Sequence, residues 1–445
     1  MSNSFLQNIK TAGVVGAGGA GFPSYKKLDA KVEIIIANGA ECEPLFTKDM
    51  TLINHYADEI IKGLLLAKEQ VGAKRAIFGI KAKHVDEIEK LTPLLKKANI
   101  ELHTMDDVYP AGDEYELVYS ATDRLIPTGG IPLHIGVVVN NVESLYNMYQ
   151  ASQGIPVTHS LICILGGVKQ PKTFWAPIGM SIEEALEVCG GAVFKEFSVI
   201  DGGAMMGNIV TDLSAAVTKT SSGYIVLDDE HDLILKKRQS ERTYKAIGKS
   251  TCDQCSICTE MCPRYLLGQP VQPHLVMRAL EFTGPDNRLL NKWAQACCEC
   301  NICSLYACPE GLDPRNMCVS AKEGNRQDDI AWSPDEAKVL TKEEHPLREY
   351  RKVPTDRLMK QLGLYKYKSD RVVFDTNKPS PKTVNILLKQ HIGQSCDASV
   401  KVGDTVKVGQ LIAKISADTL GVPIHASING TVKNITRKHI TLERK

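Results

Sequence analysis

The first 155 residues alternate stretches of helical hydrophobic spacing with short runs of apolar, β-branched residues. Hydrophobic residues recur at helical intervals in Asp58–Val71 and Val85–Lys97. Other apolar runs are continuous, as in strands buried on both faces: Val32–Ala37, Ala76–Ile80 and Ile135–Val139. This rhythm predicts an α/β domain over residues 1–155.

A second pattern predicts a small α+β unit over residues 156–235. Ser181–Cys189 has the spacing of a short amphipathic helix, with Ser181 as its N-cap and Glu184 as the reciprocal partner of a capping box. Three runs have the character of strands: Ser160–Gly166, Phe197–Ile200 and Gly223–Leu227. The unit resembles a ubiquitin-like (SLBB) module.

Short alternating strands return in residues 382–445 and predict an all-β domain. Gly-Asp, Gly-Gln and Asn-Gly turns separate these strands: Thr383–Leu388, Val406–Val408, Leu411–Ile415, Gly430–Ile435 and Ile440–Glu443. Residues 331–381 are polar and punctuated by proline, so we expect a connector with peripheral helices there. The basic stretch Lys236–Lys249 is interpreted as a solvated helix face or linker.

Charge and composition exclude several function classes. The net charge is +1, with 53 Lys and Arg against 52 Asp and Glu, whereas binding nucleic acid or an anionic membrane requires a sustained basic excess. The chain has no run of about 18 uninterrupted apolar residues, and its glycine-broken N-terminus lacks the pattern of a signal peptide. We therefore expect a soluble, cytoplasmic protein with no nucleic-acid partner and no direct membrane insertion.

Nine of the 14 cysteines lie between Cys252 and Cys308. Such clustering indicates metal binding in a reducing compartment rather than a disulfide scaffold. Two runs each have three cysteines at two-residue gaps and a fourth before proline: Cys252, Cys255, Cys258 and Cys262, then Cys297, Cys300, Cys303 and Cys308. The pattern predicts a helical domain over residues 236–330 that holds two [4Fe–4S] clusters.

The fourth cysteine of such a run ligates the neighbouring cluster. We therefore expect one set to be Cys252, Cys255, Cys258 and Cys308, and the other to be Cys297, Cys300, Cys303 and Cys262. Cys298 is an alternative to Cys297, because the last gap of the second run is one residue longer and two cysteines are adjacent. Two structural zinc sites are the competing interpretation, which the triple spacing disfavours. The scattered cysteines are assigned no chemistry: Cys42, Cys163, Cys189, Cys318 and Cys396.

Gly16, Gly18 and Gly21 have Gly-x-Gly-x-x-Gly spacing, with Gly19 between them. A dinucleotide-binding loop should follow a buried strand and open a helix, yet only two valines precede this one and Pro23 interrupts the helix. Glycines would still let backbone amides approach a phosphate or a flat ring. These residues alone favour a structural turn and a ligand loop equally.

Three further segments have the character of ligand-holding loops in α/β folds: Ala37–Pro44, Tyr109–Glu114 and Val139–Leu145. Together with the glycine loop, the first and last of them resemble the FMN- and NADH-binding segments of the flavoprotein subunit of respiratory complex I, in the same order. The whole chain resembles the RnfC component of the Rnf electron-transport complex. Its domain order resembles that of the cobalamin (corrin) reductases of propanediol-utilisation microcompartments.

The resemblance implies FMN and NADH as ligands of the N-terminal domain. The glycines would lie along the FMN with Lys27 near its phosphate or ring, and three asparagines would hydrogen-bond the flavin and its ribityl chain: Asn38, Asn140 and Asn141. Phe22 would stack on the adenine of the nicotinamide cofactor, which Glu41 and Glu43 would contact. The implied cofactor site also includes Tyr109, Gly112, Asp113 and Glu114. The choice between NADH and NADPH stays open, because Ala40 and Leu45-Phe46 depart from the complex I segment.

Residues 382–445 resemble the barrel-sandwich hybrid of biotinyl and lipoyl domains, which display a modified lysine at a hairpin tip. The corresponding stretch, Ser416–Pro423, contains no lysine. We therefore expect this domain to pack on the body of the protein or to dock a partner. At the other terminus, Ser4–Lys10 is interpreted as the first helix of the fold, with an encapsulation helix as the alternative.

A hydride carries two electrons whereas an iron–sulfur cluster accepts one, and flavin connects the two regimes. The resemblance implies an NADH-dependent oxidoreductase that passes electrons through FMN and two clusters to cobalamin, toward cob(I)alamin for a partner adenosyltransferase. No catalytic acid or base is required. The alternatives are an RnfC-like wiring protein that exchanges electrons between NADH and ferredoxin, flavodoxin or a membrane partner, and a non-catalytic scaffold. The implied location is the cytoplasm or a bacterial microcompartment, whose shell proteins would be partners.

Overall fold

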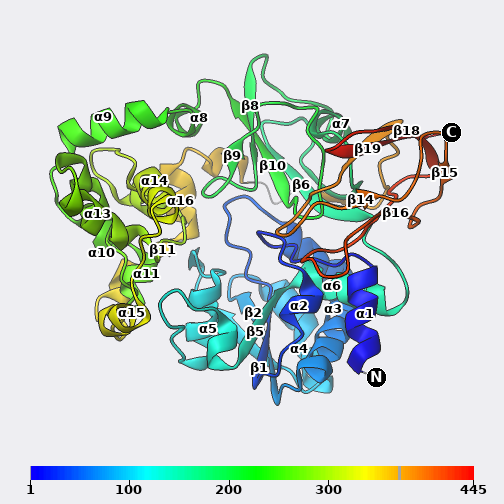
Figure 1. Cartoon of the computed structure of the whole chain (residues 1–445), viewed down its shortest axis with the longest axis horizontal. Coiled ribbons are helices and arrows are strands. Elements are labelled where there is room, and N and C mark those ends of the chain that lie inside the picture. Colours follow the sequence, from blue (N-terminus) through cyan, green and yellow to red (C-terminus); the bar gives the residue numbers. More distant parts are fainter. Residues whose placement is uncertain (1, 369–371, 445) are drawn as a thin grey trace.

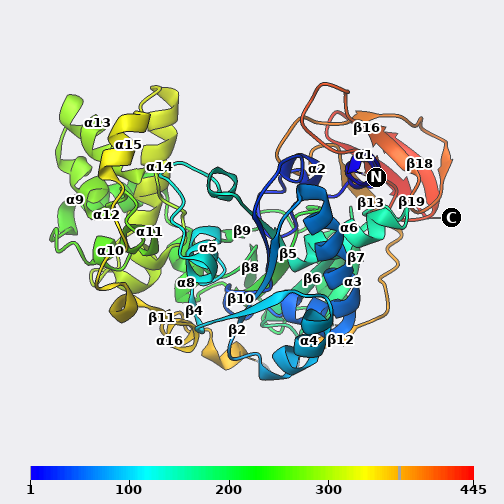
Figure 2. The ribbon, with the colours of Figure 1, turned by 90° about the horizontal axis from the view of Figure 1, so that it is seen from below.

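The computed structural model describes residues 2–368 and 372–444. Figures 1 and 2 show the cysteine-rich helical part at one end of the molecule and the C-terminal β domain at the other. The N-terminal α/β domain and a central β domain lie between them. The order of α/β, α+β, helical and all-β parts along the chain agrees with the sequence analysis.

A four-stranded parallel sheet organises the N-terminal domain. Its strands lie in the order β3 (Glu101–Met105), β2 (Arg75–Lys81), β1 (Ile34–Asn38) and β5 (Val137–Asn141). All neighbours are parallel, so their carboxyl ends share one edge, where Asn38 lies beside Asn141. The strand order reverses between β1 and β5, and ligands of such sheets bind in the crevice at that reversal.

Helices cover both faces of this sheet. Ile35 and Ala37 pack on the face covered by α1 (Ser2–Thr11), α3 (Lys48–Val71), α4 (Val85–Lys97) and α6 (Val142–Ser152). Ile34 and Ile36 pack on the other face, against α5 (Glu114–Thr122). Ile9 of α1 is fully buried in this core, which supports the interpretation of that segment as the first helix of the fold.

Two expectations for this domain are wrong. β5 begins two residues later than expected, because Pro132–Ile135 forms a 3₁₀ turn (η1) that ends at Gly136 with φ 73°. The Val139–Leu145 segment is not a loop: it forms the end of β5 and the start of α6. There the Asn141 side chain accepts a hydrogen bond from the backbone amide of Glu143 and caps the helix.

The central domain is a six-stranded sheet. Its strands lie in the order β12 (Val373–Asp375), β7 (Lys172–Pro177), β6 (His159–Gly166), β10 (Gly223–Asp228), β8 (Phe197–Asp201) and β9 (Asn208–Ile209). The expected capping box of Ser181 and Glu184 starts α7 (Ile182–Val188). β12 comes from the stretch interpreted as a connector, which therefore contributes an edge strand.

Short helices form the cysteine-rich domain. They are α8 (Asp232–Lys237), α9 (Glu241–Thr251), α10 (Ile257–Glu260), α11 (Pro263–Leu266), α12 (Pro273–Arg278), α13 (Pro285–Asn291) and α14 (Pro314–Gln327), with the single turns η2 (Ala279–Glu281), η3 (Lys292–Ala294) and η4 (Cys303–Ala307). Val276 and Met277 of α12 pack against Met317 and Ala321 of α14 to form its core. Across residues 2–368 and 372–444, no helix is long and apolar enough to cross a membrane.

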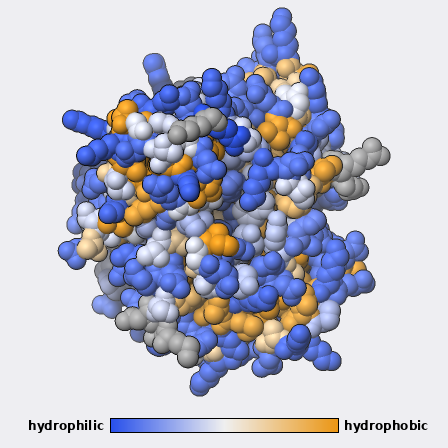
Figure 3. Space-filling model, turned by 90° about the vertical axis from the view of Figure 1, so that its right-hand side faces the viewer, coloured by the Kyte–Doolittle hydropathy of each residue, from blue (hydrophilic) through white to orange (hydrophobic). Residues whose placement is uncertain are grey.

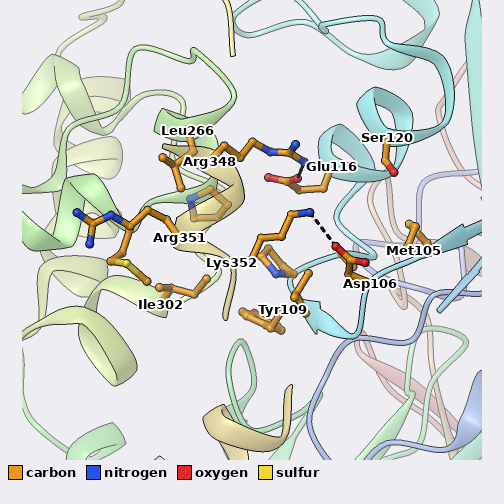
Figure 4. Close-up of a pocket in the computed structure, with 15 residues that line it drawn as sticks. Met105, Asp106, Tyr109, Glu116, Ser120, Leu266, Ile302, Arg348, Arg351 and Lys352 are labelled. Atoms are coloured by element: carbon orange, nitrogen blue, oxygen red, sulfur yellow. Dashed lines mark hydrogen bonds and ion pairs between the residues drawn. The ribbon is translucent and has the colours of Figure 1, made fainter. Parts of the chain in front are cut away.

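The connector contacts both the helical domain and the N-terminal domain. It contains α15 (Pro334–Leu340), η5 (Arg348–Arg351), β11 (Val353–Pro354), α16 (Thr355–Gln361) and η6 (Tyr365–Tyr367), and β11 pairs with β4 (Val108–Tyr109). Arg348 pairs with Glu116 and Lys352 with Asp106 at 2.8 Å, beside a pocket lined by all three parts (Figure 4). These contacts make the connector part of the domain interface.

The C-terminal domain consists of two small sheets. One has the order β13 (Thr383–Leu387), β19 (His439–Glu443), β18 (Gly430–Ile435), β15 (Thr405–Val406), and the other β14 (Asp397–Ala398), β16 (Leu411–Lys414), β17 (Ile424–His425). The backbone amide of Asn385 donates to the Gly179 carbonyl at 2.8 Å, so the domain packs on the body as expected. Figure 3 shows the hydrophobic surface on this side of the molecule as separate patches among hydrophilic side chains.

A buried lysine joins three of the parts. Lys219, in the central domain, donates from Nζ to the carbonyl of Gly13 at 2.8 Å and to that of Pro423 at 2.9 Å. Burial lowers the pKa of Lys219 to about 7. The base of the glycine loop is thus held between the central and C-terminal domains.

Gly63 marks a close approach of α3 to α6. A Cβ atom at this position would lie 2.0 Å from the carbonyl oxygen of Leu145. We expect Gly63→Ala to push the helices apart and to destabilise the fold by about 1–3 kcal/mol, measured as a lower melting temperature. Gly324→Ala is the matched control, because that glycine of α14 has open space around it. Equal melting temperatures for the two variants would contradict the close packing.

Candidate functional site

The glycine loop lies over the carboxyl edge of the parallel sheet. Its ends are joined by the hydrogen bond from the Gly16 amide to the Phe22 carbonyl at 3.0 Å. A Cβ at Gly18 would lie 3.0 Å from Cβ of Asn141, at the end of β5. α1 precedes the loop, and only an isolated bridge from Val15 to Pro23 flanks it. The loop therefore lacks the strand of a dinucleotide-binding turn but reaches the same edge of the sheet.

One side of the loop is anchored and the other is open. The Ala17 amide donates to Oγ of Ser144 on α6 at 2.9 Å. Gly21, at φ 73°, is packed so closely that a Cβ would lie 2.6 Å from Thr220 of the central domain. Gly18 and Gly19 are exposed, and no atom of residues 2–368 or 372–444 lies within 4 Å of a Cβ at Gly19. The exposed backbone leaves room for a flat ring or a phosphate beside the crevice.

The three predicted asparagines lie together at the reversal of strand order. Asn38 donates from Nδ2 to the Gly112 carbonyl at 2.9 Å and accepts from the Ala40 amide at 3.1 Å. Asn141 caps α6 and donates to Asp49 at 3.1 Å. Asn140 is 4% exposed, and its Nδ2 has no hydrogen-bond partner among the described residues. A buried amide without a partner is costly, so this atom fits a hydrogen bond to a ligand in the crevice.

Carboxylates behind the crevice are desolvated. Burial raises the pKa of Asp49 to about 6, and burial followed by the charge of Asp49 raises the pKa of Glu41 well above its ordinary value. Glu41 accepts a hydrogen bond from the Asp49 amide at 3.1 Å. Lys48 and Glu143 form an ion pair of 2.5 Å with side chains 3% and 1% exposed. Lys48 also contacts Ser222, so this ion pair joins the N-terminal and central domains.

The side chains implied to contact the nicotinamide cofactor, and Lys27, implied to lie near the FMN, are spread around the loop. Phe22 is 42% exposed and available for stacking. Glu43 accepts hydrogen bonds from the Met205 and Met206 amides, each at 2.9 Å, and so holds a loop of the central domain. Lys27 pairs with Glu114 at 3.3 Å. The structure therefore brings Phe22 near the crevice. Glu43 instead holds the Met205–Met206 loop of the central domain.

The Tyr109–Asp113 segment lies between the crevice and the cysteine-rich domain. Gly112 lies against Ala40, where a Cβ would be 2.1 Å from the carbonyl oxygen. The Tyr109 hydroxyl donates to the Cys300 carbonyl at 2.8 Å. The Asp113 carboxylate pairs with Arg264 at 2.9 Å. This segment thus connects the strand ends to the second cysteine run.

Four predicted cysteines surround one cavity. Cys252, Cys255, Cys258 and Cys308 all line the same small pocket. Burial, followed by the charges of Cys308, Cys252 and Cys255, raises the pKa of the Cys258 thiol to about 12. Four thiolates so close would repel one another without a cation between them. The arrangement fits the predicted first cluster, for which thiolates are the ligands.

The second predicted set also converges. Burial, followed by the charges of Cys297, Cys262 and Cys258, raises the pKa of Cys303 well above its ordinary value. A hydrogen bond with Cys298, then burial, then the charges of Cys298, Cys262 and Cys303 raise the pKa of the Cys300 thiol well above its ordinary value. The charges of Cys298 and Cys297 likewise act on Cys262. These interactions support the crossed pairing, which stays a prediction.

The backbone repeats between the two runs and identifies equivalent cysteines. Gln254 and Ser256, on either side of Cys255, have φ of 56° and 64°. Glu299 and Asn301, on either side of Cys300, have φ of 62° and 69°. Left-handed residues at the same two places make Cys300 the equivalent of Cys255.

Counting back three residues, Cys297 is then the equivalent of Cys252, and Cys298 is the equivalent of Asp253. The Glu299 amide donates to Sγ of Cys297 at 3.3 Å, and the Gln254 backbone makes the equivalent hydrogen bond to Cys252. Burial outweighs that hydrogen bond at Cys252 and raises the pKa of its thiol. A hydrogen bond from Cys318, the largest influence on Cys297, lowers the pKa of Cys297 to about 7. The repeat favours Cys297 over Cys298 as the ligand.

A π-helical turn absorbs the extra residue of the second run. The first run passes from Cys258 to Cys262 through α10, whereas the second passes from Cys303 to Cys308 through η4, a single π turn. The Cys308 amide accordingly donates to the carbonyl five residues back, that of Cys303, at 3.1 Å. Both runs then end in an extended cysteine before proline, with ψ of 118° at Cys262 and 117° at Cys308.

Two residues near the second set have no signal in the sequence spacing. Cys318 of α14 lies alone in the sequence, yet its thiol hydrogen-bonds Cys297. Arg264 follows the Cys262-Pro263 pair, and its charge is buried against Asp113 and Tyr115. Only a folded arrangement brings these groups to the cysteines, because their partners lie far away along the chain.

Four family models match the chain in the order of the parts described above. Residues 9–150 match the Nuo51 FMN-binding domain, 161–208 the SLBB domain, 251–313 a 4Fe-4S dicluster domain and 365–445 the RnfC barrel sandwich hybrid domain. The predicted fold class is confirmed. The predicted cofactor classes, FMN and a pair of [4Fe–4S] clusters, are confirmed as well, and the zinc interpretation is set aside.

Curated relatives cover the whole chain. Cobalamin reductase PduS of Citrobacter freundii and that of Salmonella typhimurium are each 40% identical over 444 residues, which span 100% of this chain and 97% of each relative. The C component of the Na(+)-translocating ferredoxin:NAD(+) oxidoreductase complex of Acetobacterium woodii is 33% identical over 274 residues, 60% of this chain and 59% of that protein. The predicted oxidoreductase class is thereby confirmed.

The fold is also similar to a solved NAD+-reducing [NiFe]-hydrogenase in the H2-reduced state. The TM-score is 0.52 at 18% identity, over 74% of this chain and 63% of that chain. At this identity the likeness concerns the fold alone.

The adjacent cysteines give a matched test of the ligand set. We expect Cys297→Ser to lose one cluster, so that iron and sulfide per chain fall by about half after anaerobic reconstitution. Cys298→Ser should keep both clusters, because the backbone repeat places Cys298 where the first run has Asp253. The opposite result, with iron lost only from Cys298→Ser, would show that the repeat misidentifies the ligand.

Proposed function

This chain belongs to the cobalamin reductase PduS family, and from that premise we propose that it passes electrons from NADH through FMN and two [4Fe–4S] clusters to cobalamin. The single observation that carries the proposal is that an FMN-type crevice and a pair of cysteine sets meet at one interface, through the hydrogen bond from Tyr109 to the Cys300 carbonyl. The product would be cob(II)alamin or cob(I)alamin. A partner adenosyltransferase would then use the reduced corrinoid.

We assign the FMN to the crevice between β1 and β5. Gly16, Gly18, Gly19 and Gly21 would lie along it, and the Asn140 amide would donate the hydrogen bond for which it has no partner among the described residues. Asn38 and Asn141 would orient the ring through the side chains that already fix the local backbone. Bound flavin supplies the conversion of a hydride into two single electrons. The residues of this chain bind and orient the flavin and exclude water from it. None of them is needed to move a proton.

NADH would approach from the open side of the glycine loop. Phe22 is exposed there and could stack on adenine. Glu41 remains a proposed contact, whereas Glu43 would act through the Met205–Met206 loop that it holds. Lys27, which pairs with Glu114, would lie near the phosphate or ring of the FMN and not on the NADH.

Cobalamin as the acceptor rests on the two PduS relatives. The test is an anaerobic assay of the reconstituted full chain with NADH and cob(III)alamin, followed by the absorbance of the corrinoid. We expect cobalamin reduction that depends on both FMN and the clusters. Bleaching of flavin and clusters without any change in the corrinoid would contradict cobalamin as the acceptor and leave the electron-transfer class intact.

A second candidate is a wiring role like that of RnfC in the Rnf complex. The observation that favours it is the 33% identity to the Acetobacterium woodii protein over 60% of this chain, together with the RnfC-type C-terminal domain. In that case the acceptor would be ferredoxin, flavodoxin or a membrane partner. Reduction of ferredoxin by NADH-treated protein, faster than that of cobalamin, would favour this candidate.

The propanediol-utilisation relatives also support a location. We propose that the protein works in the cytoplasm, inside a bacterial microcompartment, with shell proteins as neighbours. α1 buries Phe5 and Ile9 in the N-terminal core, so an encapsulation signal would have to lie elsewhere or require release of this helix. Co-purification of the tagged chain with intact shells, resistant to added protease, tests this location.

The orphaned amide of Asn140 gives a direct test of the flavin site. We expect Asn140→Ala to weaken FMN binding about 2- to 12-fold, because one hydrogen bond contributes about 0.5–1.5 kcal/mol. FMN affinity is measured by fluorescence quenching during titration of the flavin-free chain. Asn54→Ala is the control. It removes the hydrogen bonds of Asn54 with Glu87 and Lys90 and should bind FMN normally. Equal affinity for both variants would remove Asn140 from the site.

A further inference from the structure

Arg264 is a buried cation that neither cofactor assignment uses. It is 9% exposed and lies two residues after Cys262, at the start of α11. Its guanidinium pairs with Asp113 at 2.9 Å and lies 3.4 Å from the centroid of the Tyr115 ring. The Cys298 thiol is within hydrogen-bonding reach of the same guanidinium. Enclosing an arginine to this degree is costly unless its charge is compensated.

The contacts of Arg264 cross the boundary between two domains. Asp113 and Tyr115 belong to the N-terminal domain, at the start of α5, whereas Arg264 and Cys298 belong to the cysteine-rich domain. The Tyr109 hydroxyl crosses the same boundary to the Cys300 carbonyl. The second cysteine set is therefore the one that faces the proposed flavin crevice.

The first cysteine set lies away from this boundary. All the residues that line its cavity belong to the cysteine-rich domain, and Cys255 is exposed. The two sets adjoin each other, since the charge of Cys258 in the first set acts on Cys303 in the second. The geometry gives an inner site next to the crevice and an outer site next to solvent.

We propose that Arg264 is a positioning residue of the electron relay, which holds the cluster of Cys262, Cys297, Cys300 and Cys303 against the flavin site and makes that cluster the first acceptor. This inference rests on the proposed function. The cluster of Cys252, Cys255, Cys258 and Cys308 is then the exit, reached through the exposed Cys255. Each transfer moves one electron and no atoms: the donor is oxidised by one electron and the accepting cluster is reduced by one.

The charge of Arg264 acts on the cluster beside it. Reduction makes a cluster more negative, so a neighbouring cation stabilises the reduced form and raises the reduction potential. The Asp113 carboxylate partly compensates that cation. Removing the arginine and removing the aspartate should therefore shift the potential of the inner cluster in opposite directions, which a simple loss of packing would not do.

The first experiment is a redox titration of the two clusters by low-temperature electron paramagnetic resonance in the reconstituted full chain. We expect Arg264→Gln to lower the potential of one cluster only, Asp113→Asn to raise the potential of the same cluster, and Arg264→Lys to restore most of the lost potential. Arg278→Gln, at an exposed position of α12, is the charge-matched control and should shift neither cluster. Unchanged potentials in Arg264→Gln, or equal shifts of both clusters, would overturn the proposal.

The second experiment identifies the order by removing one ligand at a time. Freeze-quenched samples after mixing with NADH are compared for Cys255→Ala, which should lose the outer cluster, and Cys300→Ala, which should lose the inner one. In Cys255→Ala we expect the inner cluster, which remains, to become reduced. In Cys300→Ala we expect the reduction of the outer cluster, which remains, to slow at least tenfold. Rapid reduction of the outer cluster in Cys300→Ala would overturn the order.

These outcomes separate the inference from the proposed function. The redox titration uses mediators and requires neither NADH nor cobalamin, so it remains decisive if either is the wrong reactant. A failure of NADH to reduce the flavin of the unsubstituted chain would count against the proposed function. A reduced flavin with the wrong cluster responding to Arg264→Gln would count against the inference alone.

Discussion

The arrangement of the cofactor sites depends on one segment, residues 109–113, held between the carboxyl edge of the parallel sheet and the second cysteine run. Asn38 of β1 holds its Gly112 carbonyl, Tyr109 donates to Cys300, and Asp113 pairs with Arg264. A shift of this segment would move a cysteine set relative to the crevice. The connector secures the same place from outside, because β11 pairs with β4 and Lys352 with Asp106. In the proposed relay, this interface would fix the distance between the flavin site and the inner cluster.

Much of the fold could be predicted from local patterns. The buried strands of the N-terminal sheet, the capping box at Ser181 and the C-terminal strands all follow from hydrophobic spacing and turn residues. The errors occur in segments whose secondary structure depends on tertiary contacts. β3 is polar enough to lack an apolar run, the Asn-Asn pair at the end of β5 has the composition of a loop although Asn141 caps α6, and β12 becomes a strand only by pairing with β7. Each depends on a partner distant in sequence.

The candidate site likewise has parts that local sequence patterns predict and parts that depend on tertiary contacts. Cysteine spacing predicts both ligand sets, because two-residue gaps and a terminal proline are local properties of the chain. The choice between Cys297 and Cys298 required the backbone, whose left-handed residues repeat around Cys255 and Cys300. The ion pairs of Arg264 and Lys48 could not be predicted, since their partners Asp113 and Glu143 lie in other parts of the sequence. Glycine spacing indicated a close backbone approach, and the structure identified Asn141 as the side chain approached.

The proposed relay requires that electrons from NADH reach the clusters through flavin in the β1–β5 crevice. The most direct measurement prepares the full chain with both clusters but without FMN, adds NADH anaerobically, and follows the clusters by electron paramagnetic resonance before and after FMN is supplied. The account predicts that the clusters stay oxidised until FMN is added and are then reduced, the inner one first. Reduction of the clusters by NADH in the flavin-free chain would contradict it.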